Sequence, residues 1–135
     1  MALSELQSAL GGVWKYVKSE NFDQYLQERG LNLITRKMAA SSSPTLTIKV
    51  DGDQVVVKTE SVRTMENKFK LGEEFQFSDS GTEGMAVATW ENRKLIMKLK
   101  GNKGEEQIVR EIVGGELVQT MTLNGTSCKR YFKNS

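Results

Sequence analysis

Residues 45–59 read TLTIKVDGDQVVVKT, with apolar side chains at alternate positions on both sides of Asp51-Gly52. Leu46 and Ile48 precede this pair, and Val57 follows it. A period of two is typical of a β-strand with one buried face, and Asp-Gly between two such runs is a strong signal of a tight hairpin. The stretch therefore predicts two antiparallel strands and favours an all-β fold.

The same alternation continues towards the C-terminus in short runs separated by turn-forming residues. The further runs are residues 65–71, 74–78, 85–90, 95–99, 108–112, 117–123 and 126–134, with turn signals at Gly72, Ser80-Gly81, Glu91-Asn92, 101–104, Gly114-Gly115 and Asn124-Gly125. Residues 13–19 supply one more strand near the N-terminus. Ten short strands that follow one another in a meander are typical of a closed barrel or a sandwich.

Three helical segments are predicted in the first third of the chain. Leu3, Leu6 and Leu10 have helical spacing and indicate a short helix that ends at Gly11-Gly12. Two further short helices follow the first strand. The first of these is expected to end at Gly30, and the second at the serines before Pro44. The apolar residues that indicate the two helices are Phe22, Tyr25, Leu26, Leu31, Ile34 and Met38.

The polar residues of the helix pair also carry predictions. Asn21 and Gln24 have the spacing of a capping box, so Asn21 is expected to cap the first helix of the pair. Arg29, Arg36 and Lys37 are expected on solvated surfaces. Together with Lys15 and Lys18 they are either an ordinary surface or a basic lid that contacts anionic membranes.

Length, charge and residue usage exclude several classes of protein. The 135 residues suffice for one domain with a core, and the net charge of +2 does not favour nucleic acid as a partner. The chain has no histidine, which excludes histidine-based catalysis and histidine-containing zinc sites, and we expect no cofactor or metal. A single cysteine, no apolar run of transmembrane length and no basic secretory leader predict a cytoplasmic protein.

Three strands near the C-terminus carry long polar side chains in phase with apolar ones. Arg110, Gln119 and Arg130 each lie between two apolar residues of the same face, and the three strands are neighbours in an up-and-down order. No acidic residue of these strands clearly shares that face. Because a buried guanidinium needs an anion or water beside it, we predict a hollow barrel that accepts an anionic head group.

Apolar side chains on the other strands predict walls for the rest of such a ligand. The expected cavity-lining residues are Val57, Phe77, Trp90, Leu95, Met97, Met121 and Phe132. Burying roughly a dozen methylene groups contributes about 10 kcal/mol, whereas one charge-assisted hydrogen bond contributes about 1.5–3 kcal/mol. The tail should therefore supply most of the affinity, and the arginines should set the orientation of an amphipathic acid.

Several motifs of the chain resemble those of the intracellular lipid-binding proteins. They are GVWK at 12–15, SENFDQY at 19–25, FKLGEEF at 69–75 and CKR at 128–130, and the likeness runs from Gly12 to Asn134. The resemblance implies a ten-stranded antiparallel up-and-down β-barrel (a β-clam) capped by a helix-turn-helix lid. It implies one lipocalin-like domain over residues 1–135, with residues 1–11 as an N-terminal extension.

Within this family the chain is most similar to the intestinal type of fatty acid-binding protein. That similarity implies a carboxylate site at Arg110, with Trp90 and Gln119 nearby and Arg130 in the same network. It also implies a portal bordered by the lid, at Phe22, Tyr25, Leu26, Leu31, Met38 and Val62. The tyrosine that many relatives use for the carboxylate is Phe132 here, a portal phenylalanine is Val62, and Met121 replaces an aromatic residue.

The favoured function is therefore non-covalent binding and intracellular transport of long-chain fatty acids by a monomer, without enzymatic activity. Retinoic acid or another hydrophobic carboxylate, such as a bile acid, is the alternative ligand. An enzyme that uses the barrel as a pocket is disfavoured by the lack of histidine. A nuclear shuttle, with Arg36 and Lys37 in an import surface, stays open as a second location.

Overall fold

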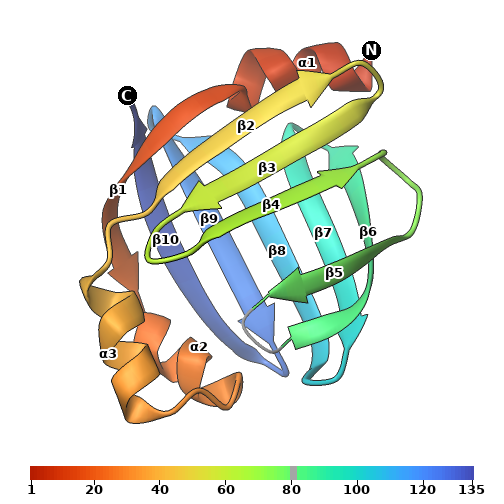
Figure 1. Ribbon diagram of the computed structural model, residues 1–135. Helices are drawn as coiled ribbons and strands as arrows, with labels where there is room; N and C mark the ends of the chain where they lie inside the picture. The colour runs from red at the N-terminus through yellow and green to blue at the C-terminus, as the bar shows by residue number, and fades with distance from the viewer. Residues whose placement is uncertain (80–81) are drawn as a thin grey trace.

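The computed structural model describes residues 1–79 and 82–135, and within these it contains ten strands and three helices (Figure 1). The strands are β1 Gly12–Glu20, β2 Thr45–Asp51, β3 Gln54–Glu60, β4 Thr64–Phe69, β5 Phe75–Asp79, β6 Thr82–Glu91, β7 Lys94–Gly101, β8 Gly104–Val113, β9 Glu116–Leu123 and β10 Thr126–Asn134. The helices are α1 Ala2–Leu10, α2 Phe22–Glu28 and α3 Leu33–Ser41. The turn predicted at Ser80-Gly81 lies outside the described residues.

The ten strands form a single antiparallel sheet that curls into a barrel. Their order is β4-β3-β2-β1-β10-β9-β8-β7-β6-β5, so consecutive strands pair except β4 and β5, and β1 also pairs with β10. Within the described residues no ladder joins β4 to β5, and the barrel is open between them (Figure 1). The predicted all-β up-and-down barrel with a helical lid is confirmed.

The stretch 45–59 forms the hairpin of β2 and β3. Ile48 lies opposite Val57, and Asp51 lies opposite Gln54. Gly52 adopts a positive φ of 65°, which a residue without a Cβ accepts at little cost. Leu46, Ile48, Val55 and Val57 are all buried, so the period of two read from the sequence is the period of the inner face.

The start of α2 corrects the predicted capping box. Asn21 is the N-cap residue but lies in the left-handed region at φ 58°, and its side chain makes no cap hydrogen bond. Its Nδ2 instead donates to the carbonyl oxygen of Ser127, 2.7 Å away in β10. The residue therefore ties the lid to the barrel rather than capping the helix.

The apolar face predicted for the second lid helix is also corrected. α3 begins at Leu33, after Asn32, whose side chain accepts a hydrogen bond of 2.9 Å from the Thr35 backbone N–H. Leu31 therefore precedes the helix. Ile34 is 73% exposed, whereas Arg36 is partly buried and forms an ion pair of 2.9 Å with the exposed Asp23 of α2.

The N-terminal helix α1 is an integral part of the barrel. It lies across the end of the barrel away from α2 and α3 (Figure 1). Leu6 and Leu10 are fully buried, and the indole N–H of Trp14 donates to the Leu10 carbonyl oxygen at 2.9 Å. The side chain of Gln7 accepts from the Val50 backbone N–H at 2.7 Å. The extension thus closes one end of the hydrophobic core.

Candidate functional site: a polar row inside the barrel

Arg110, Gln119 and Arg130 form a row across three adjacent strands. Arg110 of β8 lies opposite Gln119 of β9, and Gln119 lies opposite Arg130 of β10. Arg110 and Arg130 are each 8% exposed and Gln119 is 9% exposed. The Arg110 Nε–H donates to Gln119 Oε1 at 2.8 Å. The prediction that these three side chains meet on one inner wall is confirmed.

The surroundings of Arg130 join the row to β1 and to the lid. Its Nε–H donates to the Ser19 hydroxyl at 3.0 Å, and its guanidinium lies 4.0 Å from the ring centroid of Phe22 and 4.8 Å from that of Tyr16. Its Nη2 is buried and has no hydrogen-bond partner among the described residues. A donor of this kind is costly unless a ligand or solvent accepts from it.

The row carries two positive charges. Burial lowers the pKa of Arg110 to about 10 and also lowers the pKa of Arg130. A guanidinium group keeps its proton at neutral pH in proteins. Neither guanidinium forms a salt bridge with a carboxylate of the described residues. Two buried cations on either side of a neutral amide are suited to bind an anion, since a charge-assisted hydrogen bond to a carboxylate is among the strongest in proteins.

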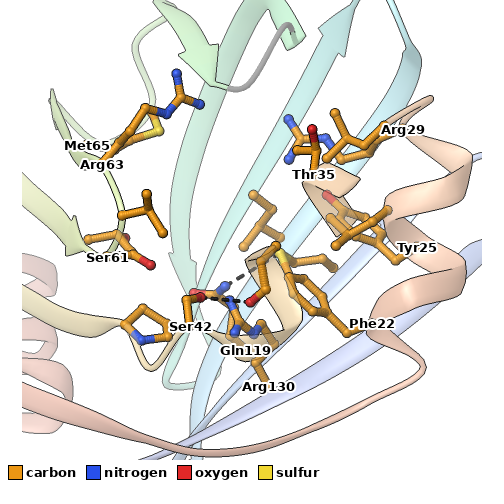
Figure 2. A pocket seen from close by; sticks show the side chains of 18 of the residues that line it. Phe22, Tyr25, Arg29, Thr35, Ser42, Ser61, Arg63, Met65, Gln119 and Arg130 are labelled. Carbon is orange, nitrogen blue, oxygen red and sulfur yellow. Dashed lines mark hydrogen bonds between the residues drawn. The ribbon is translucent and has the colours of Figure 1, made fainter. Parts of the chain in front are cut away.

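A cavity of about 340 Å³ leads from this row to the lid, a volume typical of small-molecule sites. Figure 2 shows Gln119 and Arg130 together on one side of it, with Phe22 beside Arg130. All predicted portal residues and part of the predicted lining contribute to its wall: Phe22, Tyr25, Leu26, Leu31, Met38 and Val62, then Val57, Phe77 and Met121. Their roles towards a ligand stay predictions.

Four predicted lining residues do not line this cavity. Leu95, Met97 and Phe132 are buried in the hydrophobic core, and Trp90 packs against that core. The Trp90 indole N–H donates to Glu5 Oε1 at 2.6 Å, which places the side chain against α1. These positions belong to, or pack against, the same core cluster as Leu6 and Leu10 of α1, so they serve packing.

Glu106 is the main residue that the sequence analysis missed. β8 begins at Gly104, so Glu106 is in phase with Ile108 and Arg110 and is only 4% exposed. The expectation that no acid shares the inner face is therefore wrong. The sequence pattern places residues 101–104 in a turn and begins the strand at Ile108, so Glu106 falls outside the predicted strand. Glu106 nevertheless precedes Ile108 by two positions, the spacing of residues on one face of a strand.

Tyr25 of α2 holds one side of the Glu106 carboxyl. The tyrosine hydroxyl donates to Glu106 Oε2, whereas Oε1 is buried without a hydrogen-bond partner among the described residues. Burial raises the pKa of Glu106 to about 7. Both residues line the cavity, so it contains a second polar position besides the arginine row.

Arg29 also departs from its predicted place on a solvated surface. It is 6% exposed, and its Nε–H and Nη2–H donate to the Thr82 hydroxyl at 3.2 and 2.6 Å. Its guanidinium lies 5.9 Å from the ring centroid of Tyr25 (Figure 2). Arg29 and Tyr25 thus make a polar contact between α2 and two distant strands.

Comparisons with known proteins agree with this architecture. Residues 11–135 match the lipocalin / cytosolic fatty-acid binding protein family. The chain is 42% identical over 129 residues to a fatty acid-binding protein of Tyrophagus putrescentiae, covering 92% of this chain and 96% of that one. It is 40% identical to the intestinal fatty acid-binding protein of Homo sapiens, covering 93% of this chain and 98% of that one.

Solved structures of fatty acid- and lipid-binding proteins are similar to this chain in fold. The Schistosoma mansoni fatty acid binding protein in complex with arachidonic acid has a TM-score of 0.88 and 30% identity, and the match covers 100% of this chain and 99% of that one. Apo Caenorhabditis elegans lipid binding protein 8 has a TM-score of 0.89 and 32% identity, with the same coverage.

The chain therefore belongs to the lipocalin / cytosolic fatty-acid binding protein family. This is a family of carrier proteins rather than enzymes, which confirms the prediction that the chain is not an enzyme. In the part of the chain that the structure describes, no helix has the length and apolar character needed to cross a membrane. No group of three potential metal ligands occurs in the same residues.

Proposed function

We propose that this protein binds one long-chain fatty acid and carries it through the cytoplasm as a monomer. The observation that supports this most directly is the row of Arg110, Gln119 and Arg130 at the wall of a cavity lined largely by apolar side chains. The row presents two cations that no carboxylate of the described residues neutralises. The fatty acid-binding relatives support the same ligand class.

The two parts of the ligand have different roles in this proposal. The tail lies against apolar residues such as Val57, Phe77 and Met121, where each buried methylene contributes about 0.8 kcal/mol. The carboxylate accepts hydrogen bonds from Arg110, and from the unpartnered Nη2 of Arg130. Affinity then depends mainly on tail length, and the choice between acid and alcohol depends on the row.

The test compares oleate with oleyl alcohol in titrations of delipidated protein. We expect oleate to bind one-to-one and more tightly by about tenfold or more, since charge-assisted hydrogen bonds contribute about 1.5–3 kcal/mol. Arg110→Gln should remove this preference. Lys129→Gln, on the outer face of β10, is the control and should keep it. Equal affinity of the wild type for acid and alcohol would contradict the proposal.

We also propose contact with anionic membranes, through fewer basic residues than the sequence predicts. Arg29 is buried and Arg36 is paired with Asp23, so the basic lid reduces to Lys37, with Lys15 and Lys18 on β1. Exposed apolar residues of α3, Leu33 and Ile34, add a second kind of contact.

Sedimentation with vesicles tests this contact. We expect binding to vesicles that contain anionic lipid, weakened by salt and by Lys37→Glu.

A further inference from the structure

A second polar position lies in the cavity, apart from the arginine row. Glu106 is buried on β8, and its Oε1 has no hydrogen-bond partner among the described residues. Its other oxygen accepts from the Tyr25 hydroxyl, which holds the carboxyl in place against α2. Both residues are part of the cavity wall. Glu106, a residue of the cavity wall, therefore has one buried oxygen without a partner among the described residues.

The position of Glu106 relative to Arg110 follows from strand geometry. The two residues are four apart on β8 and share its inner face, so their Cα atoms are roughly 13 Å apart at about 3.4 Å per residue. A carboxylate held at Arg110 and a group beside Glu106 would therefore belong to distant parts of one long ligand. An unsubstituted tail would place methylene groups against Glu106 and leave its free oxygen unpaired, which is unfavourable.

We propose that the preferred ligands are fatty acids with a hydroxyl group along the chain, and that this hydroxyl hydrogen-bonds to Glu106. The inference rests on the proposed function, because it needs the acid head group at the arginine row. A hydroxyl suits this position because it is both donor and acceptor. It can donate to the carboxylate or accept from the protonated acid, so it satisfies Glu106 in either protonation state.

Oleate and its mid-chain hydroxy derivative ricinoleate are a matched pair for the test. We expect the delipidated wild type to bind ricinoleate about tenfold more tightly than oleate, the ratio that corresponds to one hydrogen bond to a charged group. In Glu106→Leu this preference should disappear and reverse, because the hydroxyl would be buried without a partner. Glu105→Leu, on the exposed face of the same strand, is the control and should keep the wild-type ratio.

A second variant guards against a structural effect of the leucine. Glu106→Gln keeps the size of the side chain and an oxygen that can accept from Tyr25, and it presents amide N–H groups to the ligand. At about pH 8.5 the wild-type carboxylate predominates, so we expect ricinoleate to bind more tightly than its ketone counterpart. Glu106→Gln should bind both equally, because an amide can donate to a ketone.

The outcomes separate the two proposals. Equal affinities of the wild type for oleate and ricinoleate, or an unchanged ratio in a folded Glu106→Leu, would overturn this inference and leave fatty acid binding intact. Failure of the wild type to bind either acid would overturn the proposed function and this inference with it. A ricinoleate preference that is lost in Glu106→Leu and kept in Glu105→Leu would establish the second polar position.

Discussion

Charged side chains of both signs line the cavity, and no salt bridge joins Glu106 to Arg110 or Arg130 in the described residues. Glu106 and Arg110 lie on one face of β8, four positions apart, with Cα atoms roughly 13 Å from each other, and they form no salt bridge. Arg130 forms a hydrogen bond with Ser19, and Glu106 forms one with Tyr25. Glu106 Oε1 and Arg130 Nη2 thus keep unsatisfied hydrogen-bonding capacity that a ligand can use, at a cost to the stability of the empty protein.

Glu106 should make stability depend on pH in a defined direction. Burial raises its pKa from the usual 4.5 to about 7, so the folded state retains the proton over a range in which the unfolded chain releases it. The stability associated with this group is therefore fully present below about pH 4.5 and is lost as pH rises through about 7. Cys128, whose pKa burial raises to about 12, stays neutral throughout.

The corresponding experiment compares wild type with Glu106→Gln by urea unfolding across this pH range. The variant should be the more stable protein at high pH, by up to roughly 3 kcal/mol, and this advantage should shrink as pH falls towards about 4.5. Glu105→Gln, at an exposed position, should follow the wild type at every pH. A difference between wild type and Glu106→Gln that does not change with pH would contradict the assignment.

Among the helices, α1 shows how a short element is held by tertiary contacts. Its 9 residues are too few for a stable isolated helix, so its stability must come from packing. Leu6 and Leu10 are fully buried in the core, and the Gln7 side chain and Glu5 carboxylate bond to Val50 and Trp90. The helix therefore closes the barrel at the end opposite the lid.

Truncating one of these leucines tests the role of α1. Leu6→Ala should lower the free energy of unfolding by about 2–5 kcal/mol, the usual cost of replacing a fully buried leucine. Ser8→Ala, at an exposed position of the same helix, should change it by no more than about 0.5 kcal/mol. Chemical unfolding followed by Trp14 and Trp90 fluorescence measures both. Similar stabilities of the two variants would mean that α1 does not contribute to the core.

The complete molecule combines a closed end, an open seam between β4 and β5, and a lid attached at a few polar points. Asn21 bonds to β10, Tyr25 to β8 and Arg29 to β6, so α2 is fastened to three strands. α3 has no fully buried side chain in the described structure, and its apolar residues Leu33 and Ile34 face solvent. Of the two lid helices, α3 is therefore held less firmly by packing.

Ligand binding should stabilise this assembly as a unit, because a ligand that binds only the folded state shifts the unfolding equilibrium. At a free oleate concentration of 100 times its dissociation constant, the gain should be about 2.7 kcal/mol. Thermal unfolding with increasing oleate measures it as a rising midpoint. Arg110→Gln should need a higher oleate concentration for the same rise. A midpoint that is insensitive to oleate would contradict binding to the folded barrel.

Much of this arrangement could be predicted from the sequence because β-strands carry their burial pattern locally. The period of two in residues 45–59 and in 117–123 identifies the inner face without reference to other strands. Arg110, Gln119 and Arg130 could be placed together since an up-and-down order makes their strands neighbours. The barrel and the arginine row both follow from this periodicity.

The contacts between the helices and the barrel could not be predicted from the periodicity of the sequence. Three hydrogen bonds join residues 53 to 85 positions apart: from Tyr25 to Glu106, from Arg29 to Thr82 and from Trp90 to Glu5. Local pattern does not encode such pairs, because they depend on how α1 and α2 dock onto the curved sheet. Periodicity along the chain was therefore sufficient for the strands and the inward arginines. The docking of elements distant in sequence decided which polar groups share the cavity. It also decided which end of the barrel α1 fills.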